Sequence, residues 1–267
     1  MSRTRMICHG VDSSQPIVFL LSSIAIYISF SPLASFLSVK TPLFKTSQRK
    51  KYILKNVVKA GVLSVLFLLS IVTMVFVPSW SSVIYKYLGS IYVSNDFVAL
   101  WILYHDLKTS TKIHHLVTNV AIIIYWNLDM EEYLEAKLLF FYAFFSLATF
   151  YVNLYMGLRL CYKENDLEGL KKICMYGYPM VLMLNWIVQL SQMWSAGGAA
   201  LWFVIIILLV LYDDLVLVHW CWKKSRQSST IQVKINSSSV DNYNDNNTNI
   251  IELLQSPSLA EGMLRRR

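Results

Sequence analysis

Residues 201–222 read "LWFVIIILLVLYDDLVLVHWCW", an apolar run that carries two adjacent aspartates, Asp213 and Asp214. A helix needs about 20 mostly apolar residues to cross the hydrocarbon core of a bilayer, and this run is long enough. Charged groups at that depth are costly and usually face the inside of a helical bundle. The stretch therefore predicts a transmembrane helix that packs against other helices of a multipass protein.

Further apolar runs extend this pattern through the chain. Of the 267 residues, 55% are hydrophobic and only 15% are charged, which is too apolar for a soluble domain of this length. We predict an all-α membrane protein with seven transmembrane helices, at residues 17–39, 57–78, 83–105, 110–128, 134–158, 175–194 and 199–222. The segment 226–267 is rich in Ser, Asn and Asp and is predicted to be a disordered tail.

The net charge of +8 is concentrated in the loops. If the seven spans alternate, the basic loops all fall on one side, including the loop after the first span, to which we assign Lys55 and Lys59. The opposite loops 79–82 and 195–198 contain no Lys or Arg. The positive-inside rule then places the C-terminus in the cytosol and the N-terminus in the lumen. Because topology explains the charge, we predict no nucleic-acid partner, and we interpret the first helix as uncleaved.

Polar side chains recur inside five successive predicted spans, several of them three or four residues apart on one helix face. Such groups either form hydrogen bonds between helices or line a cavity. We favour a central cavity that is lined by the third to seventh spans and is open to the cytosol. We predict that substrate binds to residues of the later spans. These are Asn119, Thr149, Asn153, Asn185, Gln189, Asp213 and Asp214.

The adjacent histidines His114 and His115 open the fourth predicted span. Neighbouring residues on a helix lie about 100° apart, so only one imidazole of the pair faces a cavity. A neutral imidazole suits general acid–base catalysis, and Asp96 is predicted to orient it. A purely structural role remains the alternative. No third ligand with clear spacing accompanies the pair, so we predict no metal site.

Two segments, "STKIHHLVTN" (110–119) and "SLATFYVNLYMGLR" (146–159), resemble the TLC-domain family, which includes ceramide synthases and TRAM proteins. The resemblance covers about residues 50–225 and implies a six-helix barrel there, preceded by an N-terminal segment 1–49 and followed by the tail 226–267. It implies that His114 and His115 correspond to the family's histidine pair, which is catalytic in ceramide synthases. The chain lacks the further acidic residues that follow that pair in ceramide synthases, so it is identified as a divergent member outside them.

Three functions follow as expectations. The first is a multipass protein of the endoplasmic reticulum or a related endomembrane that binds or processes lipid and influences membrane lipid composition. The second is an acyltransferase that uses His114, His115 and Asp96, with acyl-CoA as co-substrate and no resident cofactor. The third is a non-catalytic cargo receptor or chaperone. Membrane lipids are the expected partners in the first two, and the sequence favours no oligomeric state.

Overall fold

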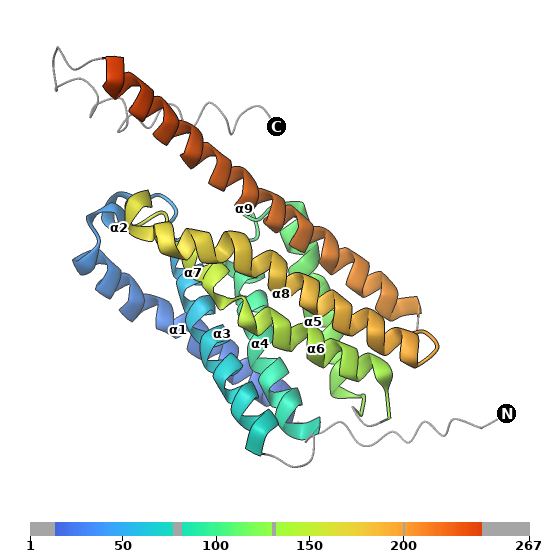
Figure 1. Ribbon diagram of the computed structural model, residues 1–267. Helices are drawn as coiled ribbons and strands as arrows, with labels where there is room; N and C mark the ends of the chain where they lie inside the picture. The colour runs from blue at the N-terminus through green and yellow to red at the C-terminus, as the bar shows by residue number, and fades with distance from the viewer. Residues whose placement is uncertain (1–13, 77–81, 130–131, 200, 242–267) are drawn as a thin grey trace. The chain divides into compact units, whose positions relative to one another are not determined.

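The computed structural model describes residues 14–76, 82–129, 132–199 and 201–241 (Figure 1). All regular elements within these ranges are helical, which confirms the all-α prediction. In chain order they are α1 Ser14–Lys40, α2 Pro42–Thr46, α3 Lys50–Phe76, α4 Ser82–Leu103, α5 Thr109–Trp126, α6 Leu134–Ala148, α7 Phe150–Leu158, the short 3₁₀ helix η1 Glu164–Leu167, α8 Glu168–Ser195 and α9 Leu201–Asp241.

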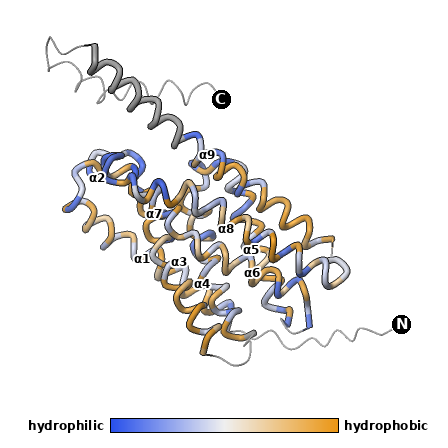
Figure 2. Tube along the Cα trace, viewed as in Figure 1, coloured by the Kyte–Doolittle hydropathy of each residue, from blue (hydrophilic) through white to orange (hydrophobic). Residues whose placement is uncertain are grey.

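Four helical segments are long and apolar enough to cross a bilayer, and a fifth is present if the bent pair α6–α7 forms one span. The four are Ser14–Lys40, Lys50–Phe76, Glu164–Ser195 and Leu201–Lys223. Figure 2 shows the corresponding apolar stretches in orange, with hydrophilic residues around α2. The structure therefore supports an integral membrane protein with four or five spans and does not confirm seven.

The two remaining predicted spans do form helices, α4 and α5, but their polar residues lower the hydropathy of each. Asp96 lies in α4, and α5 begins with Lys112, His114 and His115 within its first two turns. These polar side chains are turned toward neighbouring helices, since Asp96, His114 and His115 are all buried. By length and hydropathy alone, α4 and α5 are therefore not among the helices that qualify as membrane spans.

The helices pack as close pairs, α3 with α7, α1 with α4, α4 with α5 and α6 with α8. Gly157 lets α7 approach the backbone of α3, because a Cβ at this position would lie 2.8 Å from Val57 Cγ2 and 3.2 Å from Ile53 O. Buried apolar residues of α3, α4, α5 and α6 form the main core, with Leu63, Tyr92 and Ile122 among them. This core packs α4 against α3, α5 and α6.

The chain divides into two units, residues 1–222 and 223–267. The predicted disordered tail was wrong for its first part, because α9 continues as a helix to Asp241. Neither Gly nor Pro occurs between residues 201 and 241, so nothing in the backbone interrupts the helical hydrogen bonds. The remainder of the predicted tail, residues 242–267, lies outside the described residues.

Candidate functional site

The Asp96 carboxylate joins three helices at the centre of the bundle. It is fully buried on α4. From α3, Lys59 Nζ donates to Asp96 Oδ1 at 2.5 Å, and from α5 Thr118 Oγ1 donates to Oδ2 at 3.1 Å. His115 Nδ1, also on α5, lies 3.0 Å from Oδ1. A buried carboxylate requires such partners, because burying it alone is very costly.

The assignment of Lys55 and Lys59 to a cytosolic loop was wrong. The structure begins α3 at Lys50, so both lysines lie inside the helix, and they are only 8% and 7% exposed. They are four residues apart and therefore share one helix face. The span was predicted to start at residue 57 because the lysines before that position lower the local hydropathy. The four-residue spacing of the two lysines was the available signal that they belong to one buried face.

His115 is buried, and it is close to Asp96 without a well-aligned hydrogen bond. Its side chain is 3% exposed, and neither ring nitrogen has a hydrogen-bond partner among the described residues. The 3.0 Å contact with Asp96 is therefore close, but its angle lies outside hydrogen-bond geometry. Asp96 is therefore the carboxylate that lies beside this ring.

His114 belongs to a second polar cluster. Its Nδ1 lies 3.7 Å from Asp213 Oδ2 on α9, and Thr111 Oγ1 donates to Asp213 Oδ1 at 3.2 Å. The two imidazoles meet edge to face, with ring centroids 5.5 Å apart and planes at 82°. The pair therefore connects the Asp96 cluster to Asp213, as expected for neighbouring residues that point in different directions.

Asp214 lies beside Asp213 in the chain but has different partners. Tyr178 of α8 donates its hydroxyl to Asp214 Oδ1 at 2.9 Å, and Tyr142 of α6 donates to Oδ2 at 3.5 Å. The two tyrosines are functional candidates that sequence reasoning missed, because isolated tyrosines carry no spacing signal. Through Asp213 and Asp214, α9 thus has polar contacts with α5, α6 and α8.

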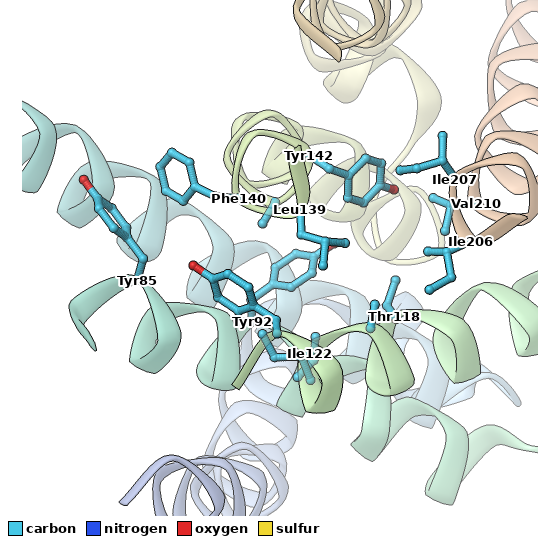
Figure 3. A pocket seen from close by; sticks show the side chains of 14 residues that line it. Tyr85, Tyr92, Thr118, Ile122, Leu139, Phe140, Tyr142, Ile206, Ile207 and Val210 are labelled. Atoms are coloured by element: carbon cyan, nitrogen blue, oxygen red, sulfur yellow. The ribbon is translucent and has the colours of Figure 1, made fainter. Parts of the chain in front are cut away.

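An apolar cavity of about 60 Å³ lies next to the Asp96 cluster (Figure 3). Its wall comes from α4, α5, α6 and α9 and includes Tyr92, Thr118, Tyr142 and Ile207. Thr118 is the link to the polar cluster, because its hydroxyl also donates to Asp96. Neither histidine lines the cavity, and α8, which was expected to contribute, supplies none of the lining residues.

The other predicted binding residues bond mainly to helix backbone. Gln189 Nε2 donates to Leu138 O at 2.8 Å and to Asn185 Oδ1 at 3.4 Å, which joins α8 to α6. Asn119 Nδ2 donates to His115 O at 2.7 Å. Thr149 Oγ1 donates to Ser146 O at 2.7 Å at the break between α6 and α7, and Asn153 is half-buried on α7. These contacts stabilise helices and their packing.

Three potential metal ligands also meet at the cluster. One ligand atom from each of Asp96, His114 and His115 lies within 4.8 Å of the other two, the single such group within the described ranges. The Lys59 ammonium already pairs with Asp96 Oδ1, and Lys55 lies within electrostatic range. A divalent cation would have to sit beside these positive charges. The residues present therefore fit an ammonium–carboxylate–imidazole cluster better than a zinc site.

The fold and this site define an integral membrane protein of helical class with a buried polar cluster beside an apolar cavity. No protein-family model matches the chain, and comparisons with curated proteins and with solved structures give no match. The functional argument therefore rests on the chemistry of the cluster and the cavity.

Proposed function

We propose that the protein is a multipass endomembrane protein of TLC type that binds or processes lipid and influences membrane lipid composition. One observation carries the proposal: Thr118, in the wall of the apolar cavity, donates a hydrogen bond to the buried Asp96 carboxylate. Small-molecule sites are mostly apolar with a few placed polar groups. An apolar space that ends at a polar cluster therefore matches an amphipathic ligand. The resemblance of residues 110–119 and 146–159 to TLC proteins supports the same class.

The proposed topology has seven spans, with the N-terminus in the lumen of the endoplasmic reticulum or a related compartment and the C-terminus in the cytosol. The positive-inside distribution of Lys and Arg supports it. So does the burial of the polar residues of α4 and α5, because neighbouring helices shield them from lipid. Protease protection of tags at the two ends of the chain tests this orientation, and protection of both tags together would contradict it.

Filling the cavity is expected to exclude a lipid chain. We would replace Ala143, a lining residue, by Phe and crosslink the purified protein with a neutral long-chain alcohol that carries a diazirine. We expect crosslinking to cavity-lining peptides to fall about tenfold, the effect of a loss of about 1.4 kcal/mol of binding free energy. Leu68→Phe, at a side chain that is 63% exposed on α3, is the matched control and should leave the yield unchanged. Equal yields from Ala143→Phe and the wild type would contradict the proposal.

Acyl transfer from acyl-CoA is a second candidate function, favoured by the 3.0 Å separation of His115 Nδ1 and Asp96 Oδ1. In this reaction the oxygen or nitrogen of an acceptor attacks the thioester carbon while His115 takes its proton. The C–S bond then breaks, and the CoA thiolate leaves and accepts that proton. Asp96 would stabilise the imidazolium that forms transiently, the role of an orienting carboxylate in catalytic triads.

His115→Ala is expected to remove this activity if the protein has it. General acid–base catalysis contributes about 10²–10⁴-fold to a rate, so transfer of a labelled acyl group from acyl-CoA to membrane lipid should fall by at least about 100-fold. His105→Ala, at an exposed histidine that follows α4, is the control and should retain full activity. A wild-type protein without transfer activity would refute acyl transfer and leave lipid binding as the function.

A further inference from the structure

Residues 40–51, where α1 passes through α2 into α3, form a linker with five exposed basic side chains and no acidic one. The five are Lys40, Lys45, Arg49, Lys50 and Lys51. No Asp or Glu occurs anywhere in residues 13–95. None of the five cations forms an ion pair with a residue that the structure describes. This basic linker, seen as the hydrophilic region around α2 in Figure 2, thus carries positive charge without a counterion from the described chain.

The basic linker is folded around one buried aromatic side chain. Phe44 of α2 is 1% exposed and packs in one cluster with Leu37 of α1 and Ile53 of α3. Thr41 Oγ1 donates to Leu37 O at 2.8 Å, which fixes the passage from α1 into α2. Lys50 Nζ at the start of α3 lies 6.0 Å from the centroid of the Phe44 ring. The basic residues of α1, α2 and α3 are therefore grouped around a common anchor.

The position of the linker is at the surface of the bilayer. It joins α1 to α3, and both helices are long and apolar enough to cross a membrane. On α1 the exposed apolar side chains continue to Val39, which is 80% exposed, and the next residue is the exposed Lys40. Long basic side chains at the end of a span extend their charges to the headgroup region. The cations of the linker consequently lie at the level of the lipid headgroups.

The orientation of the chain in the membrane does not require these cations to lack partners. Lys and Arg set that orientation, whereas Asp and Glu contribute little to it. The segment before and at the start of α8 is also basic, but there Lys171 Nζ lies 2.7 Å from Glu164 Oε1, and Lys172 Nζ lies 2.9 Å from Glu168 Oε1. Groups of about 4–8 Lys or Arg directly beside a span are typical of binding to anionic lipid. The unpaired cations of the linker match this pattern.

We propose that the basic linker binds the headgroups of anionic phospholipids in the surrounding bilayer. Its ammonium groups and the Arg49 guanidinium supply charge-assisted hydrogen bonds to phosphate and carboxylate oxygens. Leu43, which is 49% exposed on α2, supplies an apolar contact beside them. The site uses none of the residues that line the cavity, so it adds a second lipid contact that is independent of the proposed cavity ligand.

The test compares phosphatidylserine with phosphatidylcholine of the same acyl chains. Both are titrated onto the purified full-length protein in a neutral detergent, and bound lipid is counted by native mass spectrometry. One Lys or Arg near an anionic surface contributes about fivefold to binding, so we expect phosphatidylserine to bind at least about tenfold tighter. The combined variant Lys45→Gln, Arg49→Gln and Lys51→Gln should lower this ratio of affinities by at least about tenfold. In a parallel measurement of lipid competition by fluorescence, salt at about 1 M, where the Debye length is about 3 Å, should also lower the ratio.

The matched control removes the same number of charges at exposed lysines outside the linker, by Lys108→Gln, Lys163→Gln and Lys172→Gln. It should keep the wild-type preference for phosphatidylserine. An equal loss in this control would show that net charge sets the preference and would refute the site. Equal binding of both lipids by the wild type, or an unchanged preference in the linker variant, would refute it too.

A measurement on the wild type alone locates the site even if the linker variant does not fold. Phosphatidylserine with a diazirine on its headgroup should crosslink to peptides that contain residues 40–51. Crosslinks confined to other peptides would overturn the assignment. None of these results bears on the cavity, because the proposed cavity ligand is tested by crosslinking to the peptides that line it.

Discussion

Asp96→Ala is expected to destabilise the protein more than any other single substitution in the polar cluster. It leaves the Lys59 ammonium buried, with the nearest carboxylate oxygen removed. Breaking a buried ion pair by removing one partner costs about 3–5 kcal/mol, a large share of the roughly 5–15 kcal/mol that stabilises a typical domain. We expect a large fall in Tm, measured on the detergent-solubilised protein by intrinsic fluorescence or by size-exclusion recovery after heating.

The matched control removes both charges at once. Apolar residues that replace both members of a buried ion pair are often neutral or stabilising, so Lys59→Met combined with Asp96→Leu should recover much of the stability lost in Asp96→Ala. The double variant also eliminates the orienting partner of His115. Its stability should therefore return without any return of acyl-transfer activity, if the wild type has that activity. A Tm of Asp96→Ala equal to that of the wild type would show that Lys59 is not charged in the folded protein.

Gly157→Ala is expected to have the second-largest effect, because α7 and α3 touch at this glycine. The added methyl group would lie 2.8 Å from Val57 Cγ2 and 3.2 Å from Ile53 O. The valine methyl can rotate away, but the backbone oxygen moves only if α3 moves. Overpacking of this kind costs about 1–3 kcal/mol, which should appear as a lower Tm in the same assay.

Gly61→Ala is a control for which we expect no loss of stability, in contrast to Gly157→Ala. Nothing lies within 4 Å of a Cβ at Gly61, on the exposed side of α3. Alanine favours a helix over glycine by about 0.8–1.0 kcal/mol, so this variant should be as stable as the wild type or more stable. If Gly157→Ala were stabilised to the same extent, the close approach of α3 and α7 would be wrong.

The two variants of largest effect both change contacts of α3, one with α4 and one with α7. Gly157 positions α3 against α7, and Lys59 connects α3 to Asp96 on α4. Thr118 then connects Asp96 to α5 and to the wall of the cavity. The lipid site that we propose thus depends on the position of α3, although α3 contributes no residue to the cavity wall. Changes in helix packing at Gly157 are expected to alter lipid binding through this connection.

The helices themselves could be predicted from the sequence, because helical structure and apolar length are local properties. Each of the seven predicted segments is largely helical, including the run 201–222, although the segment 134–158 covers the two helices α6 and α7. The prediction was less accurate at the ends. The start of α3 was placed at residue 57 rather than Lys50, and the bend of 41° that separates α6 from α7 was not anticipated. Both errors arise where polar residues, whose burial depends on neighbouring helices, interrupt an apolar run.

Some residues of the site could likewise be identified from the local sequence, whereas others depend on contacts between helices. His114, His115 and Asp96 were selected from the sequence as polar residues inside apolar helices, and the structure brings them within a few ångströms of one another. Lys55 and Lys59 were missed, because a lysine near the end of an apolar run is normally solvated. Only the tertiary structure shows that Asp96, on another helix, is the counterion of the buried Lys59. Asn185 and Gln189 carried an equally strong pattern, yet they bond within the α6–α8 interface.

The sequence by itself thus determined the class of the protein, the places of its helices and the polar residues worth testing. Composition and the spacing of side chains along one helix are sufficient for those conclusions. Only the tertiary structure decided that Asp96 accepts from Lys59 and Thr118, that His114 faces Asp213, and that the cavity adjoins Thr118 rather than the histidines. These facts depend on which faces of separate helices meet, and the packing of α3, α4, α5 and α9 sets that arrangement through contacts between residues far apart in the chain.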